Sequence, residues 1–204
     1  MQKALPEELG VYGTASLVLA VLLRGVLSCM DRLDLRRHFK HLYQPSAKRV
    51  EVVDVPELKF ASKGRSEDPI DYSVMPLEAL WWAEDGQFDI SQPGNWKWTA
   101  MILQPDHITD SMFEGALGKL RNKRPSPALD RLRFAVFHEG LCMQTMHIGP
   151  YSDEPATLAK MEAFARESGY VLRGKHHEIY LGDPRRSAPE KLKTILRHPI
   201  QADH

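Results

Sequence analysis

Cysteine is scarce in this chain of 204 residues, which has only Cys29 and Cys142. The two cysteines form no CxxC pair, and structural zinc sites normally need four nitrogen or sulfur ligands. Disulfide-bridged scaffolds are typical of small secreted domains, so we expect free thiols and a reducing, cytoplasmic location. A single disulfide is the alternative that two cysteines leave open.

The chain also lacks an excess of charge of either sign and lacks nucleotide-binding glycine motifs. Lys+Arg and Asp+Glu both number 27, so the formal net charge is zero and nucleic acid is not an expected partner. Neither GxGxxG nor a P-loop occurs, so we expect no nucleotide cofactor. His176 and His177 are adjacent and would face opposite sides of a strand, so we expect no metal site.

A hydrophobic run long enough to cross a membrane is absent as well. The uncharged run at residues 11–23 is shorter than the roughly 20 residues that a spanning helix needs. Glu7 and Glu8 precede it, where a signal peptide would carry positive charge. We interpret residues 1–29 as an upstream extension of doubtful status, with Met30 as a possible natural start. A signal or anchor segment is the rival interpretation.

What is present is an ordinary globular balance, with 43% hydrophobic and 26% charged residues. Strands are predicted at residues 50–55, 96–105, 174–183 and 192–200, with residues 59–65 continuing or pairing with the first. Helices are predicted at residues 31–43, 77–86, 110–123 and 156–169. The second of these would begin after Pro76 and end at Gly86, and the third would be capped by Thr109 or Asp110. Residues 131–151 are predicted as a hairpin that turns at Glu139-Gly140.

The order of these elements predicts an α+β fold built from two similar units, each with a helix on antiparallel strands. We place one domain at residues 30–204. Its two pseudo-repeats would span roughly residues 48–130 and 131–200. This repeat rests on the order of the elements alone, because the two halves share no repeated residues.

Five segments in order along the chain are similar to the GyrI-like (gyrase-inhibitor-like) family. They are PLEALWW (76–82), WKWTAMILQPDHIT (96–109), EGLCMQTMHIGPYSDE (139–154), HHEIYLGDPRR (176–186) and KTILRHPI (193–200). The resemblance covers about residues 31–200. It is strongest to the stand-alone bacterial subgroup that includes cyclopropanoid cyclopropyl hydrolases, which lacks a helix-turn-helix in front.

The resemblance implies a duplicated strand-helix-strand-strand module, a curved antiparallel sheet with two main helices and a central ligand cleft. It also implies binding of flat, hydrophobic or aromatic small molecules of the drug or toxin kind. Some members of the subgroup detoxify DNA alkylators by adding water to their cyclopropane ring, so the chain is expected to be such a hydrolase. Two alternatives stay open: a non-catalytic, multidrug-sequestering protein, and a gyrase-inhibitor-like interaction module. The chain is expected to be a monomer or homodimer.

Glu178 matches the family's hallmark glutamate on a late strand at the base of the cleft. On a strand, His176, Glu178 and Tyr180 share one face because side chains alternate. A carboxylate among aromatic rings loses hydration, which raises its pKa unless it is paired, and it can then bind a ligand donor or transfer a proton. The alternative is an edge strand whose polar residues face water.

Glu78 and the tryptophans form the second candidate group. On the predicted helix, Glu78 and Trp82 are four residues apart and share a face, with Trp81 about 100° further round. A carboxylate beside an indole suits a flat aromatic ligand, and Trp82 and Trp98 would sandwich it. The alternative is that at least one of these rings only fills the core.

Two further residues follow from the segment at 139–154. His147 could act as a general base, although a structural histidine is the more common case. Tyr151 lies near the position of a family tyrosine and could hang over the cleft. In the expected reaction, Glu78 or Glu178 steers water, and Tyr180 or Tyr151 donates to the ligand carbonyl. The predicted catalytic residues are Glu78, Glu178 and Tyr180, and the predicted ligand-binding residues are Trp81, Trp82, Trp98, His147, Tyr151 and His176.

Overall fold

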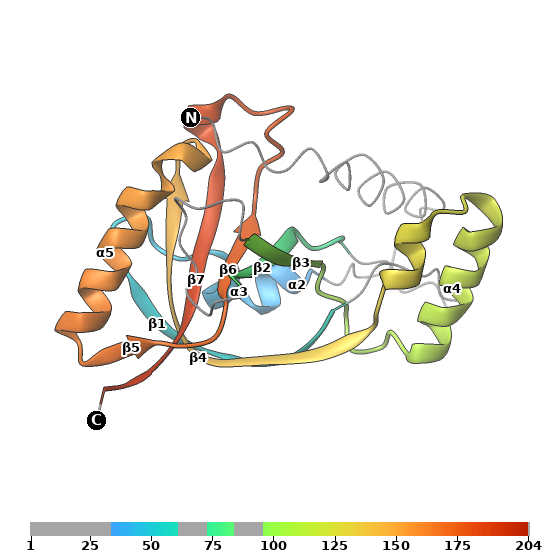
Figure 1. Cartoon of the computed structure of the whole chain (residues 1–204), viewed down its shortest axis with the longest axis horizontal. Helices are drawn as coiled ribbons and strands as arrows, with labels where there is room; N and C mark the ends of the chain where they lie inside the picture. The colour runs from blue at the N-terminus through green and yellow to red at the C-terminus, as the bar shows by residue number, and fades with distance from the viewer. Residues whose placement is uncertain (1–33, 61–72, 84–95, 204) are drawn as a thin grey trace.

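The computed structural model describes residues 34–60, 73–83 and 96–203, and these form one curved, antiparallel sheet with helices on both faces (Figure 1). The strands are β1 (Glu51–Phe60), β2 (Leu77–Ala83), β3 (Trp96–Met101), β4 (Ala135–Ile148), β5 (Tyr170–Leu172), β6 (His176–Tyr180) and β7 (Lys193–Ala202). Their order across the sheet is β1-β4-β7-β6-β2-β3, and the short β5 pairs with β7. The predictions for residues 1–29, 61–65, 66–72 and 84–95 lie outside the described residues.

The helices are α2 (Leu35–His38), α3 (Lys40–Tyr43), α4 (Asp110–Lys123) and α5 (Glu154–Glu167), with 3-10 turns at Pro127–Arg131, Tyr151–Asp153 and Pro189–Lys191. The Thr109 side chain accepts a hydrogen bond from the Met112 amide at 3.3 Å, which confirms the predicted cap of α4. Gly169 has a φ of 71° just beyond α5, as expected for a helix end.

Each face of the sheet is covered by a different helical layer. On the face that we call the front, Met161 and Ala165 of α5 pack against Met143 and Leu196 of β4 and β7. On the back face, Leu42 and Tyr43 of α3 belong to a larger apolar cluster with the core of the sheet. The side chains of neighbouring residues in β6 and β7 therefore enter two separate layers.

Helix α4 stands at the opposite end of the molecule from α5 (Figure 1). It has a small apolar cluster of its own with the segment that leads into β4. Phe113 stacks on Phe134 with ring centroids 5.7 Å apart, and Leu117, Leu120 and Leu129 complete the cluster.

Two predicted elements are wrong. Residues 77–83 form β2, not a helix, because this segment pairs with β3 on one side and β6 on the other. Residues 135–148 form the single long strand β4, not a hairpin. Gly140 does adopt a left-handed φ of 71°, but there the chain continues, pairing with β1 and then with β7.

The predicted fold class is confirmed: the chain is α+β, with a curved antiparallel sheet and two main helices, α4 and α5. The strands predicted at 50–55, 96–105, 174–183 and 192–200 are present, as are the helices at 110–123 and 156–169. The helix predicted at 31–43 is split into α2 and α3. Within the described ranges, no helix has the length and apolar character needed to traverse a bilayer.

Candidate functional site

Strand β6 is the centre of the candidate site, and all five of its residues are buried. Its register with β2 places Ala79 opposite Glu178 and Trp81 opposite His176. His176, Glu178 and Tyr180 therefore share the front face with Trp81, as strand alternation predicts.

A chain of polar contacts fixes the carboxylate of Glu178. The Tyr180 hydroxyl donates to Glu178 Oε2 at 2.8 Å and accepts from Trp81 Nε1 at 3.1 Å. On the other side, His176 Nε2 lies 3.3 Å from Glu178 Oε1. One carboxylate oxygen therefore accepts a hydrogen bond and the other lies within ion-pair distance of an imidazole, while the group is removed from bulk water.

Aromatic rings surround this carboxylate. Trp96 meets Trp81 edge-on with centroids 5.7 Å apart, and Tyr151 meets Tyr180 in the same way at 6.0 Å. Trp98 pairs with Trp81 across the β2–β3 ladder and packs against the same cluster. Trp96, Trp98 and Tyr151 are only half-buried, so their rings form the outer side of the cluster. We call the front-face group of Trp81, Trp96, Trp98, Tyr151, His176, Glu178 and Tyr180 the aromatic site.

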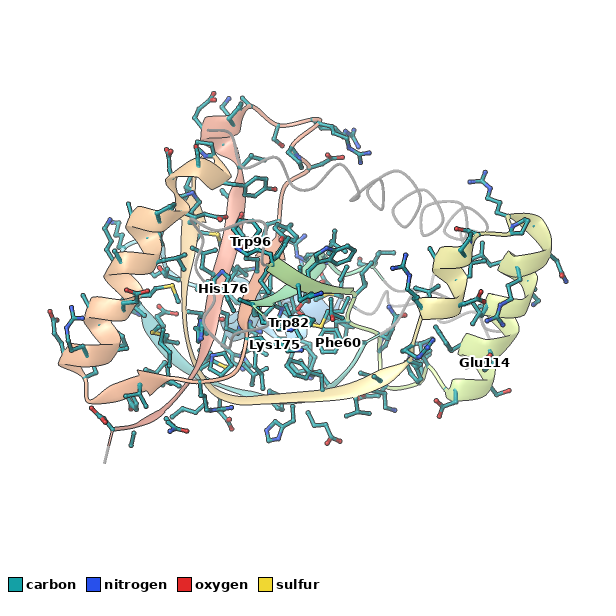
Figure 2. All side chains as sticks on the ribbon, viewed as in Figure 1. Phe60, Trp82, Trp96, Glu114, Lys175 and His176 are labelled. Atoms are coloured by element: carbon teal, nitrogen blue, oxygen red, sulfur yellow. The ribbon has the colours of Figure 1, made fainter. Side chains whose placement is uncertain are left out.

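His198 extends the aromatic site onto β7. Its ring centroid lies 5.8 Å from that of His176. Burial, with the nearby His176, lowers the pKa of His198 to about 3, so this ring is neutral at physiological pH. In Figure 2, Trp96 and His176 lie near the middle of the molecule, and Glu114 of α4 lies far from them.

Glu78 and Trp82 do not belong to the aromatic site, which corrects the prediction. A helix over residues 77–86 would place them beside Trp98, but in β2 they alternate with Trp81 and face the back of the sheet. Trp82 instead carries the ammonium group of Lys175 over its ring, 3.6 Å from the centroid (Figure 2). The predicted sandwich of Trp82 and Trp98 is therefore not formed.

Behind the aromatic site, a set of buried polar side chains crosses the back face. We call it the back-face ionic network, and it consists of Tyr43, Glu78, Glu139, Gln144, His177 and Arg197. The Tyr43 hydroxyl donates to Glu78 Oε1 at 2.6 Å, and His177 Nε2 lies 3.0 Å from Glu78 Oε2. His177 Nδ1 lies 3.0 Å from Glu139 Oε2, so the imidazole stands between two carboxylates.

Arg197 closes the other end of the back-face ionic network. Its guanidinium lies 3.4 Å from Glu139 Oε2 and donates to Gln144 Oε1 at 3.1 Å. It also donates to the Leu42 carbonyl at 2.8 Å, which ties the network to α3.

The charges of the back-face ionic network perturb one another. Burial opposes a charge on His177, but the Glu139 carboxylate and then Glu78 outweigh it and raise the pKa of His177 to about 9. Burial likewise opposes ionisation of Glu139, but His177 and Arg197 lower its pKa to about 2. Burial and the Glu78 carboxylate raise the pKa of Tyr43 well above its usual value. At neutral pH His177 is therefore an imidazolium.

His147 has a structural position. Its Nδ1 lies 2.9 Å from Thr157 Oγ1 and its Nε2 lies 3.1 Å from the Pro150 carbonyl, so both ring nitrogens hold the start of α5. Tyr151, two residues from Gly149, meets Tyr180 edge-on and so adjoins the aromatic site, and its role in ligand binding stays a prediction.

Of the two tryptophans that share a strand face, Trp96 and Trp98, the sequence analysis selects only Trp98, whereas the structure brings both to the aromatic site. Tyr43, Glu139 and Arg197 are not found from the sequence. They come from segments far apart in the chain, and the predicted turn places Glu139 in a loop.

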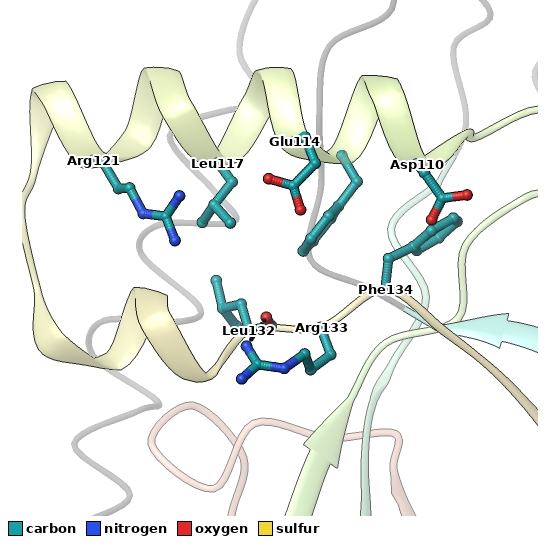
Figure 3. A pocket seen from close by; sticks show the side chains of 8 residues that line it. Asp110, Glu114, Leu117, Arg121, Leu132, Arg133 and Phe134 are labelled. Atoms are coloured by element: carbon teal, nitrogen blue, oxygen red, sulfur yellow. Dashed lines mark hydrogen bonds between the residues drawn. The ribbon is translucent and has the colours of Figure 1, made fainter.

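Other candidate centres carry less chemistry. A hollow of about 320 Å³ lies between α4 and residues 132–134, where Leu117 and Arg121 point toward Leu132 (Figure 3). It shares no residue with the aromatic site. Cys142 is a free, buried thiol whose pKa is raised by burial, and Cys29 lies outside the described residues. Among residues 34–60, 73–83 and 96–203, no three His, Cys, Asp or Glu side chains are grouped to hold a metal ion.

The curved sheet and the aromatic site together define an α+β small-molecule-binding domain. Residues 49–201 match the GyrI-like small molecule binding domain, and the chain belongs to this family. The resemblance inferred from the sequence is thereby confirmed. No curated protein matches the chain.

Solved structures from Listeria innocua are similar over most of the chain. An uncharacterized conserved protein is 34% identical with a TM-score of 0.76, covering 83% of this chain and 100% of its own. Two structures described as hydrolases are 32% and 33% identical, with TM-scores of 0.71 and 0.72. They cover 83% and 84% of this chain, respectively, and 100% of their own.

Proposed function

We propose that the protein is a hydrolase that binds flat, largely apolar aromatic molecules in the aromatic site and adds water to an electrophilic ring carbon. The substrate class is the cyclopropane-bearing DNA alkylators, and the outcome is detoxification. The observation that carries the proposal is Glu178, a buried carboxylate that accepts a hydrogen bond from Tyr180 and lies 3.3 Å from His176 Nε2, next to a cluster of aromatic rings. Similarity to two structures described as hydrolases supports it.

Binding would use the half-buried rings of Trp96, Trp98 and Tyr151. Stacked or edge-on aromatic contacts contribute about 0.5–1.5 kcal/mol each beyond burial of area. The inner rings of Trp81 and Tyr180 are held by hydrogen bonds, so they form a rigid floor. A planar guest on this floor would place an electrophilic carbon near Glu178.

The reaction is an addition of water, and it needs no reactant besides water and the ligand. Glu178 accepts a proton from the water molecule while the water oxygen bonds to the cyclopropane carbon. At the same time, the carbon–carbon bond of the ring breaks. The electron pair of that bond moves into the conjugated system toward the ligand carbonyl oxygen. Glu178 returns the proton to the Tyr180 oxygen while the Tyr180 hydroxyl proton passes to the ligand oxygen, which regenerates both groups.

Incubation with a cyclopropane-bearing alkylator tests the proposal, with the ring-opened product followed by mass spectrometry. Turnover above buffer is expected for the wild type. Glu178→Gln and Tyr180→Phe should each be slower by about 10²-fold or more, the usual size of a general acid–base contribution. Glu162→Gln, an exposed glutamate on α5, is the matched control and should keep full activity.

Two outcomes would contradict the hydrolase proposal. The first is a wild-type rate equal to that in buffer. The second is an unchanged rate in Glu178→Gln. Saturable binding with release of unaltered alkylator would instead assign a sequestering protein.

A further inference from the structure

The back-face ionic network lies directly behind the aromatic site, on the same strands. In β6, His177 stands between His176 and Glu178, so one backbone segment carries both groups. In β2, Glu78 precedes Ala79, and Ala79 is the partner of Glu178 across the ladder. A displacement of His177 or Glu78 therefore displaces the residues that hold the reacting carboxylate.

The network joins four strands that are neighbours in the sheet. Glu139 belongs to β4, Arg197 to β7, His177 to β6 and Glu78 to β2, in the order that these strands take across the sheet. The contacts of His177 with Glu78 and Glu139, at 3.0 Å each, fix β6 from both sides.

Stability alone is a poor reason for such a network. Its two carboxylates are balanced by one guanidinium and one imidazolium, so the set is neutral when His177 is protonated. Well-packed apolar side chains often give the same or higher stability than a buried ionic set, because desolvation offsets the attraction. What the ionic set adds is a defined geometry, because its hydrogen bonds, from Tyr43 to Glu78, between His177 and Glu139 and from Arg197 to Gln144, each have a required distance and direction.

We infer that His177 and Glu139 are positioning residues for the proposed hydrolysis: from the back of β6 they hold Glu178 and Tyr180 in place against the bound ring. This inference rests on the proposed function. Neither residue touches the substrate. A misplacement of about 1 Å at a reacting group is enough to slow a reaction about 10²-fold.

The protonation state of His177 gives this role a pH signature. Glu78 from β2 and Glu139 from β4 contact His177 directly, and Arg197 is its partner across the β6–β7 ladder. Tyr43 from α3 reaches the imidazole only through Glu78. The pKa of His177 is raised to about 9, whereas burial raises the pKa of Tyr43 well above its usual value, so Tyr43 keeps its proton when His177 titrates. Loss of the His177 proton is therefore the event expected to unsettle the network between pH 8 and 10.

The test uses a charge-balanced double variant, His177→Gln with Glu139→Gln. It removes one positive and one negative group, so Glu78 and Arg197 still balance and the chain should fold. His138→Gln, an exposed histidine next to Glu139, is the control. The kcat and KM for the cyclopropane-bearing alkylator are measured from pH 6 to 10, with the rate in buffer subtracted.

For the double variant, kcat should fall about tenfold or more while KM changes little, because the stacking rings are untouched. In the wild type, kcat should decline with a midpoint near pH 9, and this decline should be absent from the double variant. His138→Gln should match the wild type in both respects.

A double variant with wild-type kcat and the same alkaline decline would overturn the inference. If the double variant does not fold, the pH profile of the wild type is the test. NMR of the imidazole ring gives the pH range in which His177 loses its proton. A wild-type kcat that stays constant across that range also overturns the inference. A wild type that binds the alkylator without turnover refutes the hydrolase proposal instead, so the two failures are distinguishable.

Discussion

Two buried glutamates lie on opposite faces of the β2–β6 pair, and each accepts a hydrogen bond from a tyrosine hydroxyl and lies within ion-pair distance of a histidine ring. The partners are Tyr180 and His176 for Glu178, and Tyr43 and His177 for Glu78. Their surroundings differ. Glu178 adjoins half-buried aromatic rings, whereas Glu78 lies in the back-face ionic network, and the proposed function assigns the ligand to the side of Glu178.

Ligand binding should depend on Trp98 but not on Trp82, the two half-buried tryptophans that the sequence predicts to sandwich the ligand. Trp98→Ala removes a ring of the aromatic site and should raise the Kd for a planar acridine about tenfold, the equivalent of about 1.4 kcal/mol. Trp82→Ala removes a ring of similar exposure from the back face and should leave the Kd within about twofold. Calorimetric titration measures both, and equal losses would place the ligand elsewhere.

At the scale of the elements, β2 shows why part of the site could not be predicted. The segment LEALWWA is buried on both faces, so it lacks the alternation that marks a strand, and its Leu and Ala favour a helix. The wrong period then placed Glu78 and Trp82 in the cleft. The faces of β6 on which its side chains lie were predicted correctly. Alternation along one strand is enough to place His176, Glu178 and Tyr180 on the same face.

The long strand β4 and the short helix α3 mark the other limit of prediction. The hydrogen bond from Arg197 to the Leu42 carbonyl joins residues 155 positions apart, and no local pattern encodes such a contact. The turn interpretation of Glu139-Gly140 was reasonable because Gly140 does adopt a left-handed conformation. Whether that glycine reverses the chain or only bends it depends on the strands available on either side.

Helix α3 should contribute measurably to stability through one hydroxyl. Tyr43→Phe leaves the Glu78 carboxylate with one donor fewer, and a buried hydrogen bond to a charged group contributes about 1.5–3 kcal/mol. We expect the free energy of unfolding in urea to fall by about 2 kcal/mol. Tyr170→Phe is the control, because no hydroxyl hydrogen bond of Tyr170 occurs within the described residues, and it should cost little. An equal loss in both variants would show that the hydroxyl of Tyr43 is not what matters.

For the whole molecule, the perturbed histidines predict a stability maximum near pH 6.5. His177 has a raised pKa, so its contribution is complete below the unfolded value of about 6.5 and is lost as pH rises through about 9. His198 has a lowered pKa. Between about pH 6.5 and pH 3 its ring is protonated in the unfolded chain but not in the folded chain, so stability falls as the pH decreases through this range. Glu139 adds a loss of stability as pH falls from its usual range through about 2.

Urea unfolding between pH 4 and 10 measures this profile. The alkaline loss should be on the order of 3 kcal/mol for the wild type, since each pKa unit corresponds to about 1.4 kcal/mol. His177→Gln should be less stable at neutral pH but nearly flat from pH 7 to 10. A wild-type curve that keeps rising beyond pH 8 would contradict the assignment of His177 as the buried cation.

The separate apolar cluster of α4 has a consequence for the way the molecule opens. Phe113, Phe134 and their leucine neighbours form a centre of their own, apart from the clusters beneath α3 and α5. A segment with its own small cluster can unfold at a lower free energy than the rest, as a local cooperative unit. The amides of α4 would then exchange with solvent hydrogen while β6 stays protected, so that end of the molecule can unfold and refold without Glu178 moving.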